Sequence, residues 1–166
     1  ALRNTDLNGL ADRVRMVHGD VREIGRLIAA QSFDAVVFNP PYRKIMSGRV
    51  NPEGQKALAR HEIAGRIEDF LKAAAWALKA KGSVFAIYPA ARTAELFDRM
   101  RAVRLEPKRA AVVYSLAASE GEFVLAEGRK GGREAMKFLP PLVIYERTGE
   151  YSPAMRGIFR DLAERA

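Results

Sequence analysis

Four residues of unusual type, Asn39-Pro40-Pro41-Tyr42, follow directly after the apolar run 33–38. An amino group conjugated with a ring or a carbonyl is a poor nucleophile, because its lone pair is delocalised. Two acceptors aimed at the hydrogens of such an amine would hold it and favour rehybridisation, which is stabilisation of a transition state by preorganised dipoles. The side-chain carbonyl of Asn39 and the backbone carbonyl of Pro40 could be these acceptors. The two prolines fix their own φ angles and so hold that carbonyl in place. Tyr42 offers a flat face on which an extruded base can stack.

A simpler explanation of the same motif is that the prolines only end a strand, which proline does well. That explanation gives no task to Asn39 or Tyr42, so we expect a ligand site here. Asp20 is the second candidate, since it also follows an apolar segment that is predicted to be a strand. Ligands of open α/β sheets bind at the carboxyl ends of the strands, where both residues are expected.

The pattern of apolar residues predicts the elements that carry these side chains. Alternation at Val14, Met16 and His18 predicts a strand, and residues 21–30 a short helix. The almost wholly apolar run 33–38 is typical of a parallel strand covered on both faces. Apolar residues at helical spacing then predict one long helix, with Ile63, Ile67, Phe70, Leu71, Ala74 and Leu78 on its buried face.

Further strands are expected at residues 83–88, 109–114, 122–127 and 141–146, with a helix around Leu96, Met100 and Val103 and a last short helix after Ser152. Glycines and charges between the last two strands predict an antiparallel hairpin with a long basic loop. Alternating strands and helices with an antiparallel finish indicate an open α/β sheet.

Composition limits the classes of protein that remain. The 166 residues are 48% hydrophobic, which suffices for one cored domain. There is no cysteine, and the only histidines are His18 and His61, so we expect neither disulfides nor a metal site. No apolar stretch approaches the roughly 20 residues that a membrane helix needs, and no signal peptide is visible. We therefore expect a cytoplasmic protein that binds no membrane.

Positive charge is in excess, with 28 lysines and arginines against 20 acidic residues and a formal net charge of +8. Such an excess favours polyanions, although it is also compatible with an ordinary solvated surface. One basic cluster follows the Asn-Pro-Pro-Tyr motif and a second lies between residues 128 and 137. The candidate contacts to nucleic acid in these clusters are Arg43, Lys44, Arg49, Arg60, Arg129 and Lys130.

The Asn-Pro-Pro-Tyr motif after an apolar strand resembles motif IV of the S-adenosylmethionine-dependent amino-methyltransferases, which act on adenine N6, cytosine N4 or glutamine N5. "VHGDV" (residues 17–21) resembles the segment of these enzymes that holds the adenine of the cofactor. The resemblance implies that Asp20 accepts from the adenine amino group and that Val21 lies beside its ring. It assigns Asn39 and Pro40 to the substrate amine and Tyr42 to the base. Pro41, the second proline of the motif, is counted with these three as a catalytic-site residue.

Nearly the whole chain is similar to bacterial tRNA(Val) adenine-N6 methyltransferases. The similarity is carried by residues 39–74, by "EPKRAAVVY", by "EGRKGG" and by "FLPPLVIYERTGEYS". It implies a Rossmann-like class I methyltransferase sheet, S-adenosylmethionine as the cofactor and tRNA as the partner. The segment "ARHE" (59–62) is characteristic of the family, but we assign no role to its His61.

Two parts of the family pattern are absent from the sequence: the acidic-Gly-x-Gly turn after the first strand and the acidic residue after the second. The resemblance therefore implies that residues 1–166 are the C-terminal portion of a single methyltransferase domain, without its first two strands. The strand at 33–38 would then have an unpaired edge, through which the chain could self-associate.

Two alternatives to the tRNA adenine methyltransferase remain at this point. Glutamine N5 methylation of a protein uses the same four-residue motif. A fragment that only binds RNA, or that is inactive, would also fit a sequence with an incomplete cofactor site.

Overall fold

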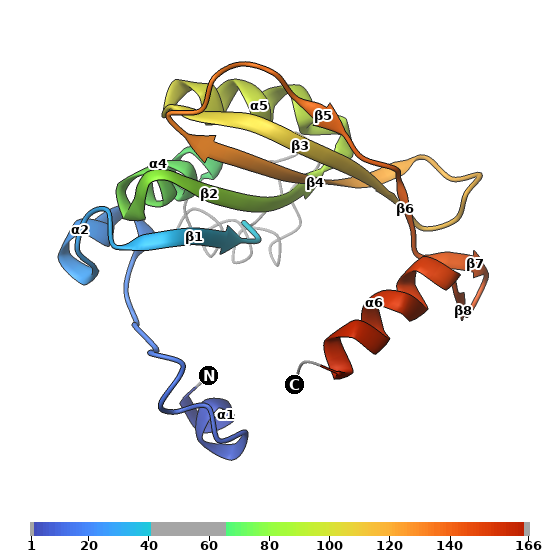
Figure 1. Cartoon of the computed structure of the whole chain (residues 1–166), viewed down its shortest axis with the longest axis horizontal. Coiled ribbons are helices and arrows are strands. Elements are labelled where there is room, and N and C mark those ends of the chain that lie inside the picture. The colour runs from blue at the N-terminus through green and yellow to red at the C-terminus, as the bar shows by residue number, and fades with distance from the viewer. Residues whose placement is uncertain (1, 41–65, 165–166) are drawn as a thin grey trace, which may run out of the picture.

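The computed structural model describes residues 2–40 and 66–164 of the chain (Figure 1). Its centre is a six-stranded sheet in the order β1-β2-β4-β3-β5, with β6 also paired to β3. The strands are β1 (Phe33–Phe38), β2 (Leu78–Pro89), β3 (Leu105–Tyr114), β4 (Gly121–Lys130), β5 (Lys137–Phe138) and β6 (Leu142–Val143). A separate two-stranded sheet joins β7 (Tyr145–Arg147) to β8 (Glu150–Tyr151).

The large sheet is mixed. β1 is parallel to β2, whereas β4 is antiparallel to both β2 and β3, so β2 and β3 point the same way with β4 between them. β5 and β6 are short and parallel to β3. This arrangement confirms the α/β class.

The predicted hairpin between residues 122–127 and 141–146 is wrong. The first of these segments lies in β4, which forms its hairpin with β3 instead and pairs along its other edge with β2. The second segment supplies β6 and β7, and β6 pairs with β3. An apolar strand with both edges paired satisfies all its backbone groups, which is why β4 occupies an interior position.

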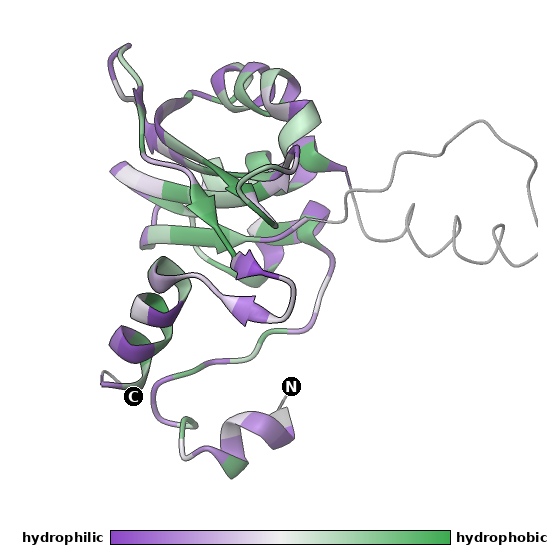
Figure 2. Cartoon of the chain, turned by 90° about the vertical axis from the view of Figure 1, so that its right-hand side faces the viewer, coloured by the Kyte–Doolittle hydropathy of each residue, from purple (hydrophilic) through white to green (hydrophobic). Residues whose placement is uncertain are grey.

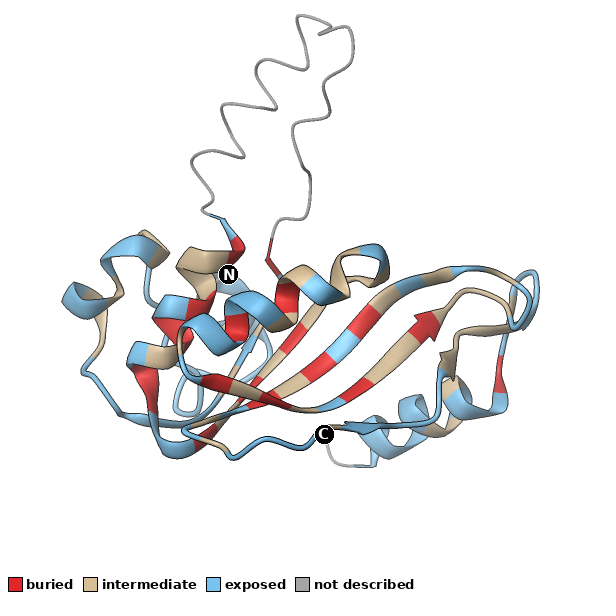
Figure 3. Cartoon of the chain, turned by 90° about the horizontal axis from the view of Figure 1, so that it is seen from above, coloured by how far each residue is buried: buried red, intermediate tan, exposed pale blue. Residues whose placement is uncertain are grey.

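Two helices cover one face of the sheet, α4 (Ile67–Ala77) and α5 (Thr93–Ala102), which follows the short helix η2 (Ala90–Arg92). Every second residue of β2 from Gly82 to Tyr88 is buried against them. Figure 3 shows these buried positions along the helices and strands. The fully or almost fully buried core comprises Ile67, Leu71, Ala74, Leu78, Val84, Tyr88, Leu96, Met100, Leu105, Ala110, Val124 and Ala126.

The long predicted helix is confirmed from Ile67 onward, while Ile63 lies outside the described residues. At its start the backbone N–H of Arg66 donates to the Asp69 carboxylate at 2.8 Å. The helix ends at Ala77, one residue earlier than expected, because Leu78 already belongs to β2. α5 agrees with the predicted helix around Leu96 and Met100.

The N-terminal part differs from the prediction. It contains α1 (Leu2–Leu7), the one-turn helix η1 (Val21–Glu23) and α2 (Ile24–Leu27). Residues 14–18 form no strand and are exposed. A strand requires a partner for its backbone groups, and within the described residues β1 pairs with β2 alone. The alternation of apolar residues at 14, 16 and 18 therefore does not produce a strand here.

The last helix, α6 (Pro153–Ala163), confirms the prediction after Ser152. The Ser152 side chain caps it by accepting from the Met155 N–H at 3.2 Å. α6 lies on the side of the sheet opposite α5, as both Figure 1 and Figure 2 show. No helix within residues 2–40 and 66–164 has the length and apolar character needed to cross a membrane.

Candidate active site

Asn39 and Pro40 extend β1 at its carboxyl end. Phe38 is level with Ala86 of β2, so Asn39 is level with Ile87 and Pro40 with Tyr88. Residues along a strand point alternately to its two faces. Pro40 is buried on the face that α4 and α5 cover, while Asn39 is exposed and lines a cavity on the other face. The predicted acceptor side chain is thus accessible, and the residue after it is held in the core.

Aromatic contacts fix the strand ends around Asn39. The Phe38 ring lies 5.8 Å from the Phe70 ring of α4, measured between centroids. Tyr88 is buried at the end of β2, and the Arg92 guanidinium carbon lies 4.8 Å from the centre of its ring. Arg92 in turn donates to Glu95 at 2.7 Å. Burial raises the pKa of the Tyr88 phenol, so this ring stays neutral beside the site.

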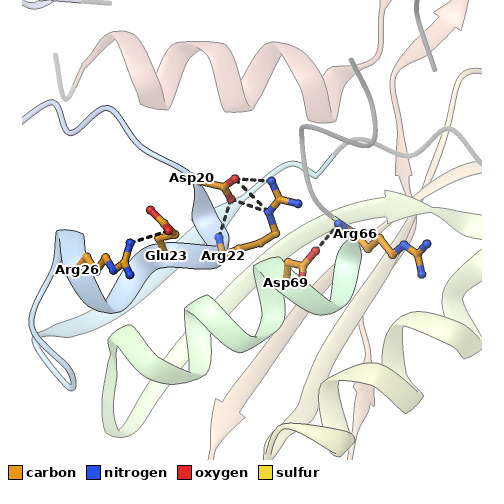
Figure 4. A network of polar contacts seen from close by, with 6 residues as sticks. All are labelled: Asp20, Arg22, Glu23, Arg26, Arg66 and Asp69. Atoms are coloured by element: carbon orange, nitrogen blue, oxygen red, sulfur yellow. Dashed lines mark hydrogen bonds and ion pairs between the residues drawn. The ribbon is translucent and has the colours of Figure 1, made fainter. Parts of the chain in front are cut away.

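Asp20, the second predicted site residue, caps η1 just before Val21. Its carboxylate accepts from the Arg22 backbone N–H at 2.9 Å and from the Arg22 guanidinium at 2.9 and 3.0 Å (Figure 4). The hydrogen bond from the Arg22 side chain lowers the pKa of Asp20 to about 2. The group is therefore a carboxylate at neutral pH, but a ligand amine would have to share it with Arg22.

The Asp20–Arg22 pair lies beside the start of α4. Figure 4 shows it next to Arg66 and Asp69, which cap that helix. The hydrogen bond to Asp20 raises the pKa of Arg22, and the negative charge of Asp69 adds a smaller contribution in the same direction. η1 thus places the Asp20 carboxylate beside the N-terminal end of α4. In sequence, residues 41–65 separate this end of the helix from Asn39 and Pro40.

The second predicted basic cluster is not next to Asn39. Arg129 is paired with Ser83, four residues before Ile87, so it lies about 13 Å from the level of Asn39 along the strands. It also pairs with Glu106, near the amino end of β3, and so lies away from the carboxyl end of β1 that Asn39 follows. Arg129 itself is exposed.

Lys130 has an internal role. Its ammonium group donates to the backbone carbonyls of Ala75 at 2.6 Å and Leu78 at 2.7 Å, at the C-terminal end of α4. Those carbonyls have no helical N–H partner at a helix end, and a cation there also complements the helix dipole. Arg129 and Lys130 belong to β4, not to a loop.

Six predicted site residues, Pro41, Tyr42, Arg43, Lys44, Arg49 and Arg60, lie outside the described residues, and so does His61. Within the described part, no three His, Cys, Asp or Glu side chains are grouped as a metal ion would require.

The sequence analysis missed the cavity that Asn39 lines. Its volume is about 620 Å³, and it is lined by residues of β1, β2, β4 and β3. The ion pair of Arg109 with Glu127 closes one side. An alternation of apolar and polar residues would distinguish the two faces of a strand. The sequence of β1 shows no such alternation, because both faces of that strand carry apolar residues.

The described residues fit S-adenosylmethionine in part. The Asp20 carboxylate can accept from an adenine amino group, and the Asn39 amide oxygen can accept from the amine of a substrate. The described glycines with positive φ, Gly9, Gly131 and Gly149, do not connect a sheet strand to a helix, so none supplies a phosphate- or carboxylate-binding turn of that kind.

Comparison with known proteins identifies two curated relatives, each described as tRNA1(Val) (adenine(37)-N6)-methyltransferase, from two strains of Porphyromonas gingivalis. Each is 31% identical to this chain over an alignment of 157 residues, and the match covers 92% of this chain and 61% of the relative. The chain thus spans about three fifths of the length of the curated relatives it matches. No protein-family model matches the chain.

Among solved structures, a predicted O-methyltransferase of Agrobacterium tumefaciens, protein Atu636, superposes with a TM-score of 0.73. The match covers 96% of this chain and 70% of that protein at 17% identity, so it concerns the fold alone. Together these comparisons confirm the resemblance and the fold class that the sequence predicted. The chain is similar in sequence to tRNA adenine-N6 methyltransferases and has the α/β fold of a Rossmann-like class I methyltransferase.

Proposed function

We propose that the chain is the C-terminal portion of an S-adenosylmethionine-dependent methyltransferase domain and that it presents the amine to be methylated, the N6 of an adenine in tRNA. The observation that carries this proposal is the accessible Asn39 side chain at the carboxyl end of β1, beside the buried Pro40. The curated relatives favour adenine over glutamine as the methylated group. Because tRNA is found there, we also propose that the protein acts in the cytoplasm.

In this proposal the Asn39 amide oxygen and the Pro40 backbone carbonyl each accept one hydrogen of the adenine amino group. The two acceptors draw the nitrogen lone pair out of conjugation and direct it along one line. When bound, S-adenosylmethionine supplies a methyl group that is carried on a sulfonium sulfur, and the sulfur keeps the electron pair of the broken C–S bond. The amine loses one proton to solvent as its new C–N bond forms, and Tyr42 stacks on the base.

Asp20 would hold the adenine of the cofactor, with Val21 beside the ring. For this the carboxylate must accept from the ligand amine while Arg22 keeps the group ionised. Among residues 2–40 and 66–164, no glycine with positive φ connects a sheet strand to a helix, so the described part offers no such turn for the rest of the cofactor. We therefore expect the chain by itself to bind S-adenosylmethionine at millimolar concentration or not at all, which calorimetry can measure; a micromolar affinity would contradict an incomplete site.

Arg43, Lys44, Arg49 and Arg60 follow the motif in sequence and are our candidates for tRNA phosphate contacts. Arg129 remains a candidate for a distant part of the same RNA, since the 13 Å to the level of Asn39 is short beside a folded tRNA. We place Lys130 apart from this set, because its ammonium group binds backbone carbonyls of α4 and β2.

The test is transfer of a tritiated methyl group to unmodified tRNA, with the chain alone and with the chain joined to the part of the Porphyromonas relative that lies outside the match. In the joined protein, Asn39→Ala should reduce turnover about 100- to 1,000-fold, since one acceptor acting at the transition state is worth about that much. Its cofactor affinity should stay within about threefold.

A matched control is Asn8→Ala, which removes another exposed asparagine, far from β1 in sequence. It should leave turnover unchanged. Wild-type turnover in Asn39→Ala would exclude the proposed amine activation. If neither the chain nor the joined protein transfers methyl groups to tRNA while both bind RNA, the chain is an RNA-binding fragment instead.

A further inference from the structure

Pro40 stands at a position where the sheet itself cannot hold the chain. It follows β1 at the level of Tyr88 on β2, and its side chain is fully buried. Proline has no N–H, so Pro40 cannot donate a ladder hydrogen bond to β2. The place of its backbone carbonyl therefore depends on the side chains that pack around the proline ring.

The side chain at the same level on the neighbouring strand is that of Tyr88. It is 1% exposed and points, like Pro40, to the face of the sheet that α4 and α5 cover. Neighbouring strands lie about 4.8 Å apart, so two side chains at one level on one face are neighbours. The tyrosine ring can thus fix the proline ring, provided that the tyrosine ring is itself held in place.

Arg92 holds the ring of Tyr88. Its guanidinium carbon lies 4.8 Å from the centre of that ring, which is the geometry of a cation–π contact. The guanidinium donates in turn to both carboxylate oxygens of Glu95, at 2.7 Å each. The side chains of Arg92 and Glu95 are only 21% and 28% exposed. A two-point ion pair of this kind orients the guanidinium plane, and a lysine cannot reproduce it.

The backbone around Arg92 is fixed as well. Arg92 is the last residue of η2, and the Thr93 hydroxyl donates to the carbonyl of Ala90, the first residue of that turn, at 2.7 Å. η2 begins directly after β2 ends at Pro89. One helical turn therefore leads from β2 to Arg92, whose guanidinium returns to the ring of the strand residue four positions earlier.

We propose that Arg92 is a positioning residue, which through the Tyr88 ring sets the place of Pro40 and of the backbone carbonyl that accepts from the substrate amine. This inference rests on the proposed function, in which that carbonyl is one of the two acceptors. Arg92 itself contacts neither the adenine nor the cofactor in this proposal. Its replacement should therefore change the rate of methyl transfer and leave the binding of tRNA unchanged.

A contact to a tRNA phosphate is the other task that an arginine beside this site could have. It fits less well, because the Arg92 guanidinium is already bound to both oxygens of Glu95 and lies over the Tyr88 ring. A phosphate would have to compete with that carboxylate.

The experiment is methyl transfer to unmodified tRNA by the joined protein of the previous section. Arg92→Met keeps a long side chain and removes the guanidinium. We expect kcat to fall about 10- to 100-fold, because a misplacement of about 1 Å costs up to that much. The KM for tRNA should stay within about threefold, since no contact to the RNA is lost. Arg92→Lys, which keeps the charge without the two-point pair, should recover only part of the loss.

Arg101→Met is the matched control. Arg101 also belongs to α5 and also pairs with a glutamate, Glu106, at 3.1 Å. It lies at the end of α5 that leads into the start of β3, away from Pro40. Its replacement should leave kcat unchanged, and circular dichroism should show that both methionine variants are folded at the assay temperature.

A double-mutant cycle with Asn39→Ala separates positioning from a general loss of folded enzyme. The two acceptors act on one amine, so the place of the Pro40 carbonyl should matter less once the Asn39 oxygen is absent. Arg92→Met should then lower kcat by less than about threefold in the Asn39→Ala background. A loss of folded enzyme would lower kcat by the same factor in both backgrounds.

The inference is overturned if Arg92→Met keeps the wild-type kcat, or if its effect is equally large in the Asn39→Ala background. It is also overturned if the KM for tRNA rises while kcat stays the same, which would indicate a phosphate contact.

Failure of the proposed function looks different, because the joined protein would then transfer no methyl group or would keep its turnover in Asn39→Ala. In that case nitrogen-15 NMR of the chain alone decides whether Arg92 sets the geometry at the end of β1. The amide signals of Asn39 should shift in Arg92→Met and not in Arg101→Met, and unshifted signals in both variants would refute the positioning role.

Discussion

Replacing Lys130 with methionine should destabilise the chain by about 2 to 3 kcal/mol. The substitution keeps the aliphatic stem of this half-buried side chain and removes its ammonium group. That group donates to the carbonyls of Ala75 and Leu78 at 2.6 and 2.7 Å and thereby ties the last strand residue of β4 to the end of α4. Sequence analysis had assigned Lys130 to RNA instead.

The magnitude follows from these two contacts. A hydrogen bond from a charged donor contributes about 1.5 to 3 kcal/mol, and a cation at a helix C-terminus adds about 0.5 kcal/mol. For two hydrogen bonds these contributions sum to about 3.5 to 6.5 kcal/mol. The carbonyls lie at a partly exposed helix end, where water can replace part of the loss, so we expect a smaller net cost of about 2 to 3 kcal/mol. For a chain of this size the melting temperature should fall by roughly 5 to 10 °C.

Urea unfolding followed by circular dichroism measures the change, and Arg129→Met is the matched control. Arg129 is the adjacent basic residue on the same strand, but its side chain is exposed, so its replacement should change stability by less than about 0.5 kcal/mol. If Lys130→Met were as stable as the wild type and only bound RNA more weakly, the internal role of the ammonium group would be refuted.

Three further predictions concern the core, the candidate site and RNA. Leu71→Ala, in the fully buried centre of α4, should cost about 2 to 5 kcal/mol in urea unfolding, and Leu162→Ala on the exposed side of α6 should cost far less. Asp20, with a pKa of about 2, should contribute stability that is complete above pH 4 and is lost as the pH falls through 2. Arg22→Ala should therefore move the carboxyl titration toward about pH 4 in carbon-13 NMR, and an unmoved midpoint would contradict the assigned cause. Neutralising Arg43 and Lys44 should lower the slope of log RNA affinity against log salt by about 0.7 to 0.9 per lost contact. An unchanged slope would show that these residues make no phosphate contacts.

The elements that sequence predicted correctly have a strong local pattern. The apolar run of β1, the helical spacing of Leu96 and Met100 and the helix after Ser152 are each legible within a few residues. The expectation that β1 is covered on both faces is wrong, since most of its residues are exposed. The errors concern pairing. The sequence of residues 122–127 does not indicate that this strand pairs with β2 and β3. The alternation at residues 14–18 likewise does not indicate whether a partner strand is present.

The same distinction holds at the candidate site. The position of Asn39 at a strand end was predictable, because the motif and the strand are adjacent in sequence. The cavity beside Asn39 was not, since four strands from distant parts of the chain form its floor. Lys130 shows a further limit, because a long basic side chain on a strand has the same sequence pattern whether its ammonium group faces water or the end of a helix.

The insertion of β4 between β2 and β3 has a consequence for the order in which the sheet is assembled. Tyr114 pairs with Gly121 a few residues later, so the β3–β4 hairpin closes a short loop and should form early. Ser83 of β2 pairs with Arg129, across a much longer segment whose closure costs more entropy. During synthesis β2 leaves the ribosome well before β4, so one of its edges must wait until residue 130 has emerged. A pause in translation before that point would prolong the time for which β2 can pair with a wrong strand.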